Sequence, residues 1–190
     1  MINWEETMIL YHGSYCSVPA PRLENCRPYK DFGLGFYLAT SINQAKNFVP
    51  SAIRKAIRLG LVPNETDFGF VSIYRFCKPS QARIQEYAQA DADWLHCIAA
   101  HRKEGTFVSV KQDLQACDII AGKIANDQTN ATLTAYLAQL YGEPGTKEAD
   151  DYCISRLLPE KLENQICLLT QTALSGLKFI GEEKICLNKH

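Results

Sequence analysis

The chain has 190 residues, of which 46% are hydrophobic, 22% charged and 10% aromatic, a composition that can bury the core of a compact domain. Its 20 Lys and Arg residues against 21 Asp and Glu residues give a formal net charge of -1, so no protein-wide positive field holds it on nucleic acid or on an anionic membrane. These values exclude a disordered chain and a protein coated by nucleic acid, but they leave room for a local basic patch.

The absence of targeting signals and the cysteine pattern favour a cytoplasmic location. No apolar run approaches the roughly 20 residues of a membrane helix, and the acidic start of the chain is unlike a signal peptide. The 8 cysteines are dispersed without a Cys-x-x-Cys pair, which argues against a zinc site and a disulfide framework. We therefore expect reduced thiols, no metal and no membrane partner. Without a repeat or a long linker, residues 1–190 are predicted to form a single domain.

The first half of the chain alternates short apolar runs with turns. Apolar, aromatic and β-branched runs predict strands, and the glycines in the turn from Asp31 to Gly35 permit a tight backbone. Ser41 is suited to begin a helix, Pro50 to bend or restart it, and Gly60 to end it. The predicted elements are strands at 8–12, 36–39 and 68–76, a helix between Ser41 and Gly60, and a helix through 94–99 whose cap is Asp91 or Asp93.

The second half continues with mixed elements. Its clearest helix is amphipathic, with Leu133, Tyr136, Leu137 and Leu140 on one face. Short strands and helices in this mixed order predict the α+β class. The predicted elements are strands at 118–122, 165–169 and 184–187, and helices at 129–141, 146–158 and 172–177.

Three short segments combine polar and aromatic residues with predicted strands. The first strand ends on His12, followed at once by Gly13. A glycine turn leads into Gly35-Phe36-Tyr37, and Phe48 lies eleven positions after Tyr37 on the next helix. Asn164-Gln165 opens a late strand.

In order and spacing these segments resemble the ADP-ribosyltransferase superfamily, in the branch named for a His-Tyr-Glu triad that includes diphtheria toxin and the poly(ADP-ribose) polymerases. Tyr11-His12-Gly13-Ser14 resembles the first-strand His-Gly motif of that branch, and Gly35-Phe36-Tyr37 resembles its second-strand motif. Nearly the whole chain is similar to a bacterial family of uncharacterised proteins within the superfamily. The resemblance implies a split β-sandwich, in which two small facing sheets surrounded by helices bind NAD in the cleft between them.

The resemblance also implies roles for individual residues. Cleavage of the bond between nicotinamide and ribose builds positive charge on the ribose, so the site must hold the ring and stabilise that charge. His12 is expected to donate a hydrogen bond to a ribose hydroxyl, and the Gly13 backbone to pair with the nicotinamide amide. Tyr37 and Phe48 would sandwich the nicotinamide ring. Ser14 and Gly35 complete the expected NAD-binding set.

Positive charge is concentrated near the expected mouth of the NAD site. The segment from Ser41 to Gly60 contains basic residues and no acidic one. This charge could belong to a solvated helix face, to a seat for the NAD pyrophosphate, for which Arg27 is the best candidate, or to a seat for a phosphate-bearing acceptor such as RNA. The basic residues concerned are Arg22, Arg27, Lys30, Lys46, Arg54, Lys55 and Arg58.

Two positions depart from the pattern of the triad branch. Gln165 stands where that branch has Glu, and a carboxamide can bind a ribose hydroxyl but brings no charge. In the family, loss of this Glu is associated with transfer of a single ADP-ribose. Ala45 replaces a Ser that the polymerases keep, which favours the bacterial toxins. Glu163 lies two positions before Gln165, where toxin relatives contact the acceptor, and is a candidate for acceptor recognition or for a general base.

Simpler interpretations exist for each of these residues. His12 could be a structural histidine, Tyr37 and Phe48 could be core aromatics, and Asp31 and Asp118 are expected to order turns rather than to touch NAD.

The function expected from the sequence is mono-ADP-ribosyl transfer from NAD to a protein or nucleic acid, as an intracellular bacterial toxin that an antitoxin restrains. The alternatives are an NAD glycohydrolase and a non-catalytic module that binds NAD or ADP-ribose.

Overall fold

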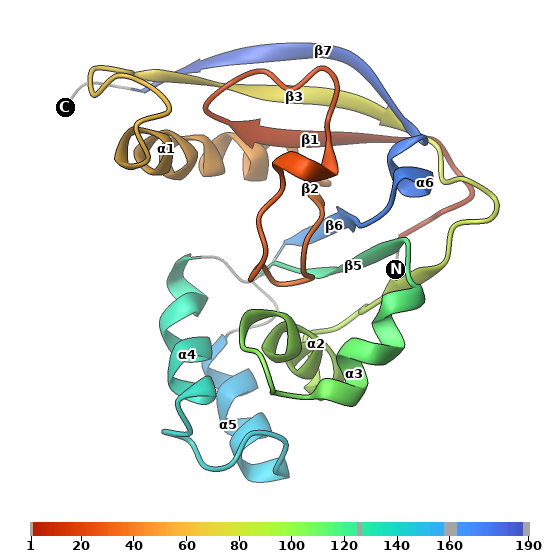
Figure 1. Ribbon diagram of the computed structural model, residues 1–190, viewed down its shortest axis with the longest axis vertical. Helices are drawn as coiled ribbons and strands as arrows, with labels where there is room; N and C mark the ends of the chain where they lie inside the picture. The colour runs from red at the N-terminus through yellow and green to blue at the C-terminus, as the bar shows by residue number, and fades with distance from the viewer. Residues whose placement is uncertain (1, 125–126, 158–162, 188–190) are drawn as a thin grey trace.

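The structure, a computed structural model of the chain, describes residues 2–124, 127–157 and 163–187. Strands and helices alternate along it, which confirms the α+β class (Figure 1). The strands are β1 (Met8–Ser14), β2 (Phe36–Ala39), β3 (Phe68–Phe76), β4 (Ile84–Glu86), β5 (Ile119–Lys123), β6 (Asn164–Leu168) and β7 (Leu177–Cys186). The helices are α1 (Ile42–Arg58), α2 (Ala92–Arg102), α3 (Val108–Asp113), α4 (Asp127–Leu137), α5 (Lys147–Leu157) and α6 (Gln171–Leu174), with short 3-10 turns at Leu23–Asn25 and Leu114–Ala116.

The strands form one sheet in the order β4-β5-β6-β2-β1-β3-β7, in which β4 and β5 are parallel and the other neighbours antiparallel. The join between β2 and β1 is narrow, because these strands pair only at Tyr11↔Ala39. By contrast, β1 pairs with β3 from Met8↔Phe76 through to Ser14↔Phe70. The strands thus form one continuous sheet rather than two separate ones, and β1 and β2 stop pairing beyond this single residue pair.

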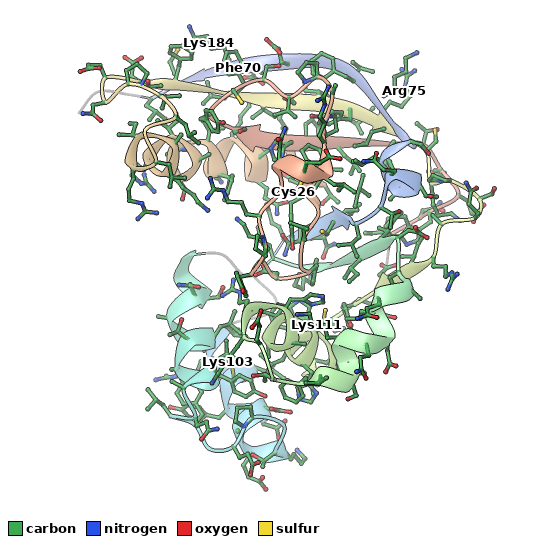
Figure 2. All side chains as sticks on the ribbon, viewed as in Figure 1. Cys26, Phe70, Arg75, Lys103, Lys111 and Lys184 are labelled. Atoms are coloured by element: carbon green, nitrogen blue, oxygen red, sulfur yellow. The ribbon has the colours of Figure 1, made fainter. Side chains whose placement is uncertain are left out.

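The helices cover different parts of the sheet (Figure 1). Helix α1 lies against β1 and β3, where Val49 and Ile53 pack with Val71. Helices α2, α4 and α5 form a group below β5 and β6, and Figure 2 shows Lys103 at the end of α2 beside α4, where its Nζ donates to Leu137 O at 2.7 Å. This group shares a core with β5 and β6 that includes Phe32, Trp94, Ile98, Ile120, Leu133, Tyr136, Cys153 and Cys167. The opposite face of the sheet buries Leu10, Phe36, Leu38, Tyr74, Phe76, Ile119, Ile166 and Leu168.

Helix α1 begins and ends where the sequence indicates. The Ser41 side chain accepts a hydrogen bond from Gln44 N, and Gly60 follows the helix with a left-handed φ of 68°. Of the two expectations for Pro50, the restart is wrong, because one helix continues through this residue. Val49 and Ile53, on either side of Pro50, are both buried with Val71 of β3, and this packing offsets the helix hydrogen bond that proline cannot donate.

Most predicted strands and helices of the first half are confirmed, and Asp91 rather than Asp93 caps α2 by accepting from Trp94 N at 3.0 Å. The sequence analysis missed β4 and α3, which are too short for a periodic pattern. Helix α4 ends at Leu137, so Leu140 is not on its apolar face and is 74% exposed. The expected helix at 146–158 is α5, and residue 158 lies outside the described residues.

The last strand was predicted too short. Strand β7 begins at Leu177, where a helix was expected, and runs beside β3 at the edge of the sheet. Its residues alternate between half-buried and exposed and include Glu182, Glu183 and Lys184, so it lacks the apolar run that marks a buried strand.

All eight cysteines are free thiols. Within the described residues, no group of three or more His, Cys, Asp or Glu side chains is arranged to hold a metal ion. The helices of the same residues include none that is both long and apolar enough to cross a membrane.

Gly13 allows α1 to approach β1, which gives the first prediction. A Cβ at Gly13 would lie 2.2 Å from Ala45 O, whereas a Cβ at Gly181 in β7 would meet nothing within 4 Å. We expect Gly13→Ala to lower the free energy of unfolding by about 1–3 kcal/mol through overpacking, and Gly181→Ala to change it by less than about 0.5 kcal/mol. Urea denaturation of both variants measures this difference, and equal losses would contradict the packing described for α1.

Candidate functional site

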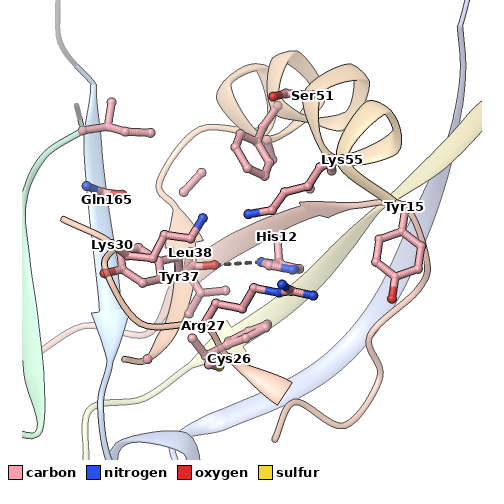
Figure 3. A pocket seen from close by; sticks show the side chains of 18 of the residues that line it. His12, Tyr15, Cys26, Arg27, Lys30, Tyr37, Leu38, Ser51, Lys55 and Gln165 are labelled. Atoms are coloured by element: carbon pink, nitrogen blue, oxygen red, sulfur yellow. Dashed lines mark hydrogen bonds between the residues drawn. The ribbon is translucent and has the colours of Figure 1, made fainter. Parts of the chain in front are cut away.

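A cavity of about 500 Å³ lies beside the opening between β1 and β2, within the usual size range of small-molecule sites. Its walls come from β1, β2, β6, α1 and the connection between β1 and β2 (Figure 3). Of the triad and NAD-binding residues expected from the sequence, the cavity is lined by His12, Gly13, Arg27, Gly35, Tyr37, Phe48 and Gln165. The fold therefore brings together segments that are distant in the chain.

His12 bridges the opening between the two strands. Its Nδ1 lies 2.8 Å from Tyr37 O (Figure 3), and Nδ1 must be the donor because a carbonyl oxygen carries no hydrogen. Burial lowers the pKa of His12 and the nearby Lys30 charge lowers it further, although the bond to Tyr37 acts in the opposite direction. The ring is therefore neutral near pH 7, and Nε2 is a hydrogen-bond acceptor. In this state Nε2 can accept a hydrogen bond from a ribose hydroxyl, whereas the expected role as a donor requires the protonated ring.

Tyr37 presents a fixed aromatic ring to the cavity. Its hydroxyl accepts a hydrogen bond from Phe32 N at 2.8 Å and donates one to Gly33 O at 2.9 Å, so the glycine turn holds the phenol in place. Burial raises the pKa of Tyr37 well above its ordinary value, and the phenol stays protonated. Phe48 faces the same cavity from α1 and is 46% exposed, which leaves its ring accessible to a ligand.

Gln165 is held by a buried carboxylate that the sequence analysis assigned only to a turn. Its Nε2 donates to Asp31 Oδ2 at 2.9 Å. Arg102 binds the other carboxylate oxygen, Oδ1, through Nε at 2.9 Å and Nη2 at 2.6 Å. Gln165 and Asp31 are both almost fully buried, and both line the cavity with Arg102. Because the amide nitrogen is committed to Asp31, the orientation of the amide is fixed and Oε1 remains as its acceptor.

Sequence reasoning missed Asp31 and Arg102 as site residues. Asp31 was expected to order its turn, and it also reaches across to β6 and to the end of α2. No periodicity or spacing links positions 31, 102 and 165, so only the tertiary fold brings them together. Asp118 likewise joins distant segments, with Oδ1 accepting from Thr170 Oγ1 at 2.6 Å and Oδ2 from Arg83 N at 2.9 Å, and it lines neither cavity near Asp31.

Three cations line the cavity near its mouth, namely Arg27, Lys30 and Lys55. Among the described residues, none of the three forms an ion pair. Burial lowers the pKa of Lys30, and the neighbouring charge of Lys55 lowers it further, with smaller effects from Arg102 and Arg27 and an opposing effect from Asp31. An anion placed among these side chains would relieve their mutual repulsion.

Two of the predicted site residues do not line the cavity. Ser14 is buried at the end of β1, where it pairs with Phe70. Glu163 is exposed, just before β6. The amide of Gln44, oriented so that its nitrogen faces acceptors, lies 3.2 Å from Glu163 Oε2, and Gln44 does line the cavity. Glu163 therefore contacts a residue that lines the cavity but does not line the cavity itself.

Comparison with known proteins gives a family but no function. A family model described as "Protein of unknown function (DUF3990)" matches residues 8–179, which include the cavity and nearly the whole sheet. The chain therefore belongs to this family. No curated protein matches the chain.

The neutral state of His12 gives a prediction on pH. In the unfolded chain His12 protonates near its ordinary pKa of 6.5, and in the folded protein only at a lower pH. The contribution of neutral His12 to the free energy of unfolding is therefore fully present above pH 6.5. It falls as the pH drops from 6.5 towards the pKa of the folded state, because the unfolded state binds the proton first. His12→Gln, whose amide can still donate to Tyr37 O, should lose less stability than the native protein between about pH 7 and about pH 5. Urea unfolding across this interval measures the effect.

The control is His101, whose pKa burial also lowers. His101 remains in the His12→Gln variant, so the free energy of unfolding of this variant should still depend on pH, but less strongly than that of the native protein. Identical pH profiles for the native protein and His12→Gln would contradict a neutral, buried His12.

Proposed function

We propose that this protein transfers a single ADP-ribose group from NAD to a macromolecular acceptor. The observation that carries the proposal is that His12, Tyr37 and Gln165, from β1, β2 and β6, line one cavity, and these are the three positions that resemble the His-Tyr-Glu triad. A sheet that opens beyond a single residue pair also supports the finer proposal of a split β-sandwich with NAD in the opening.

The cavity offers suitable groups for each part of NAD. The rings of Tyr37 and Phe48 can stack on nicotinamide. Gly13 has no side chain, and beyond Tyr11 β2 no longer pairs with this edge of β1, so the Gly13 backbone can hydrogen-bond to the carboxamide. Arg27 can bind the pyrophosphate through charge-assisted hydrogen bonds.

In the transfer step, the bond between ribose C1′ and the nicotinamide nitrogen breaks, and its electron pair leaves with nicotinamide. A nucleophilic atom of the acceptor forms the new bond to C1′ and releases its proton to solvent. Positive charge builds on the ribose during this step, so acceptors around it stabilise the transition state. His12 Nε2 and Gln165 Oε1 supply such acceptors, and the bond from Gln165 to the Asp31 carboxylate polarises the amide so that Oε1 is more negative.

The biological role that fits this activity is that of a bacterial toxin acting inside the cell and restrained by an antitoxin. This part of the proposal is supported by the resemblance alone. Two other functions use the same cavity. Water could replace the macromolecular acceptor, which gives an NAD glycohydrolase. The amide at position 165 favours the second alternative, a module that binds NAD or ADP-ribose without turnover.

One assay separates these functions. The purified protein is incubated with NAD labelled in the adenylate part and with a cell lysate, and both nicotinamide release and labelled macromolecules are measured. We expect labelled macromolecules from the native protein. His12→Ala and Gln165→Ala should reduce the rate by at least about tenfold, because each removes a hydrogen bond to the ribose. Arg54→Gln, an exposed change on α1 outside the cavity, is the control and should retain full activity.

Two other results of this assay would favour the alternative functions. Nicotinamide release without a labelled product would favour the glycohydrolase. NAD binding, measured by calorimetry, without any release of nicotinamide would overturn the transferase and favour the binding module.

The buried Asp31 predicts a specific outcome for restoring the missing Glu. Gln165→Glu alone would place a second carboxylate where the amide now lies 2.9 Å from Asp31 Oδ2, and the two like charges would repel. We therefore expect no gain in rate from this single change. The double variant Asp31→Asn with Gln165→Glu keeps the hydrogen bond and the total charge but moves the carboxylate to position 165. We expect the double variant to release nicotinamide about tenfold faster than the native protein. A charged hydrogen bond to the ribose in place of a neutral one stabilises the transition state by about 1–2 kcal/mol.

Steady-state rates and urea denaturation of the two single variants and the double variant test this prediction. A rate gain in Gln165→Glu equal to that of the double variant would show that Asp31 does not influence position 165.

A further inference from the structure

A second cavity, of about 440 Å³, adjoins the first one. The two cavities share a wall, and we call the cations Arg27, Lys30 and Lys55 in it the cationic wall. His12, Tyr37 and Gln165 line only the first cavity. The residues that line only the second are Pro28, Tyr29, Asn130, Thr134 and Leu137, from the connection between β1 and β2 and from α4. A molecule in the second cavity would thus lie next to NAD without occupying its ring-binding site.

The charge of the second cavity is strongly positive. Arg102 also lines it, but Arg102 is paired with Asp31, so the three cations of the cationic wall remain without an ion pair in the described part of the chain. Three unpaired cations on one concave surface match a ligand with several phosphates.

An exposed aromatic ring accompanies this charge. Tyr29 lies among the residues of the second cavity and is 58% exposed. Its backbone is left-handed, with a φ of 61°, which is uncommon for a residue of this size. Its hydroxyl donates to Glu104 Oε1 at 3.1 Å, so the ring is held in place although it is exposed. Phosphate-binding cations beside an accessible aromatic ring are the combination that binds single-stranded nucleic acid, because bases stack on the ring while the backbone follows the charge.

We infer that the second cavity binds a single-stranded nucleic acid and presents it as the acceptor for ADP-ribose. The phosphates of the strand lie on Lys30 and Lys55 of the cationic wall, Arg27 holds the NAD pyrophosphate, and a base stacks on Tyr29. The role of the strand as acceptor rests on the proposed function, whereas its binding in the second cavity requires no NAD turnover. In the transfer, an oxygen or nitrogen of the strand bonds to ribose C1′ and gives its proton to water, while nicotinamide leaves with the electron pair.

The experiment measures binding by the full chain of a fluorescent single-stranded oligonucleotide of about ten nucleotides, as DNA and as RNA, by anisotropy. Two phosphate contacts predict a slope of about -1.4 for log K against log salt, since each contact with a single strand contributes about -0.7. Tyr29→Asn, which removes the ring and tolerates the left-handed backbone, should weaken binding about tenfold.

The decisive variant is Thr134→Glu, which places a carboxylate in the second cavity from an exposed position of α4. It should weaken oligonucleotide binding about tenfold through repulsion of phosphates. Its control is Arg58→Gln, which makes the same change in net charge on α1 outside both cavities and should change binding by less than about twofold. Thermal unfolding of each variant verifies that it is folded.

Binding of NAD to the same variants distinguishes the two sites. Unchanged NAD affinity in Thr134→Glu, together with loss of the oligonucleotide, supports a separate acceptor site. An equal loss of both ligands would assign the second cavity to NAD and overturn the inference. Binding of a phosphopeptide but of no oligonucleotide would also overturn it. The proposed function fails independently, if the native protein binds the oligonucleotide but neither binds nor cleaves NAD.

Discussion

The hydrogen bond from His12 Nδ1 to Tyr37 O spans the place where β1 and β2 separate. After the single pair Tyr11↔Ala39 the two strands no longer pair, and the imidazole connects them instead. This arrangement opens a cavity in the middle of a continuous sheet, where rigid strands rather than loops position the side chains. It also fixes the tautomer of His12, because the nitrogen that faces the carbonyl must carry the proton. The architecture of the sheet and the chemistry of the candidate site therefore depend on the same bond.

A second polar link joins the cavity to the rest of the molecule. Asp31 receives hydrogen bonds from Gln165 on β6 and from Arg102 at the end of α2. Through this carboxylate, the connection between β1 and β2 is tied both to the sheet and to the helical group. Asp31 lines both cavities, so one buried charge influences the amide beside the proposed ribose position and also the cationic wall. In this protein, negative charge near position 165 is present on a neighbouring residue although Glu itself is absent there.

Much of the fold could be predicted from the sequence because its elements have strong local signals. Strands β2 and β3 are apolar and aromatic runs with the predicted bounds, and Ser41 marks the start of α1. The errors have physical reasons. Strand β7 is an edge strand with many charged residues, so its length follows from pairing with β3 rather than from its own hydrophobicity. Leu140 completes an apolar pattern in the sequence, but the chain leaves the helix before it.

For the site, the sequence by itself determined which residue types are available: a histidine and a glycine at the end of a strand, two aromatic rings eleven positions apart, and a glutamine at the start of a late strand. The tertiary structure alone decided that these residues share a cavity, that Nδ1 of His12 is bound to Tyr37 O, and that Asp31 and Arg102 line the same cavity. The reason is that strand ends and local motifs follow from neighbouring residues. The partner of a buried charge, in contrast, follows from how distant segments pack, and positions 31, 102 and 165 have no local relation to one another.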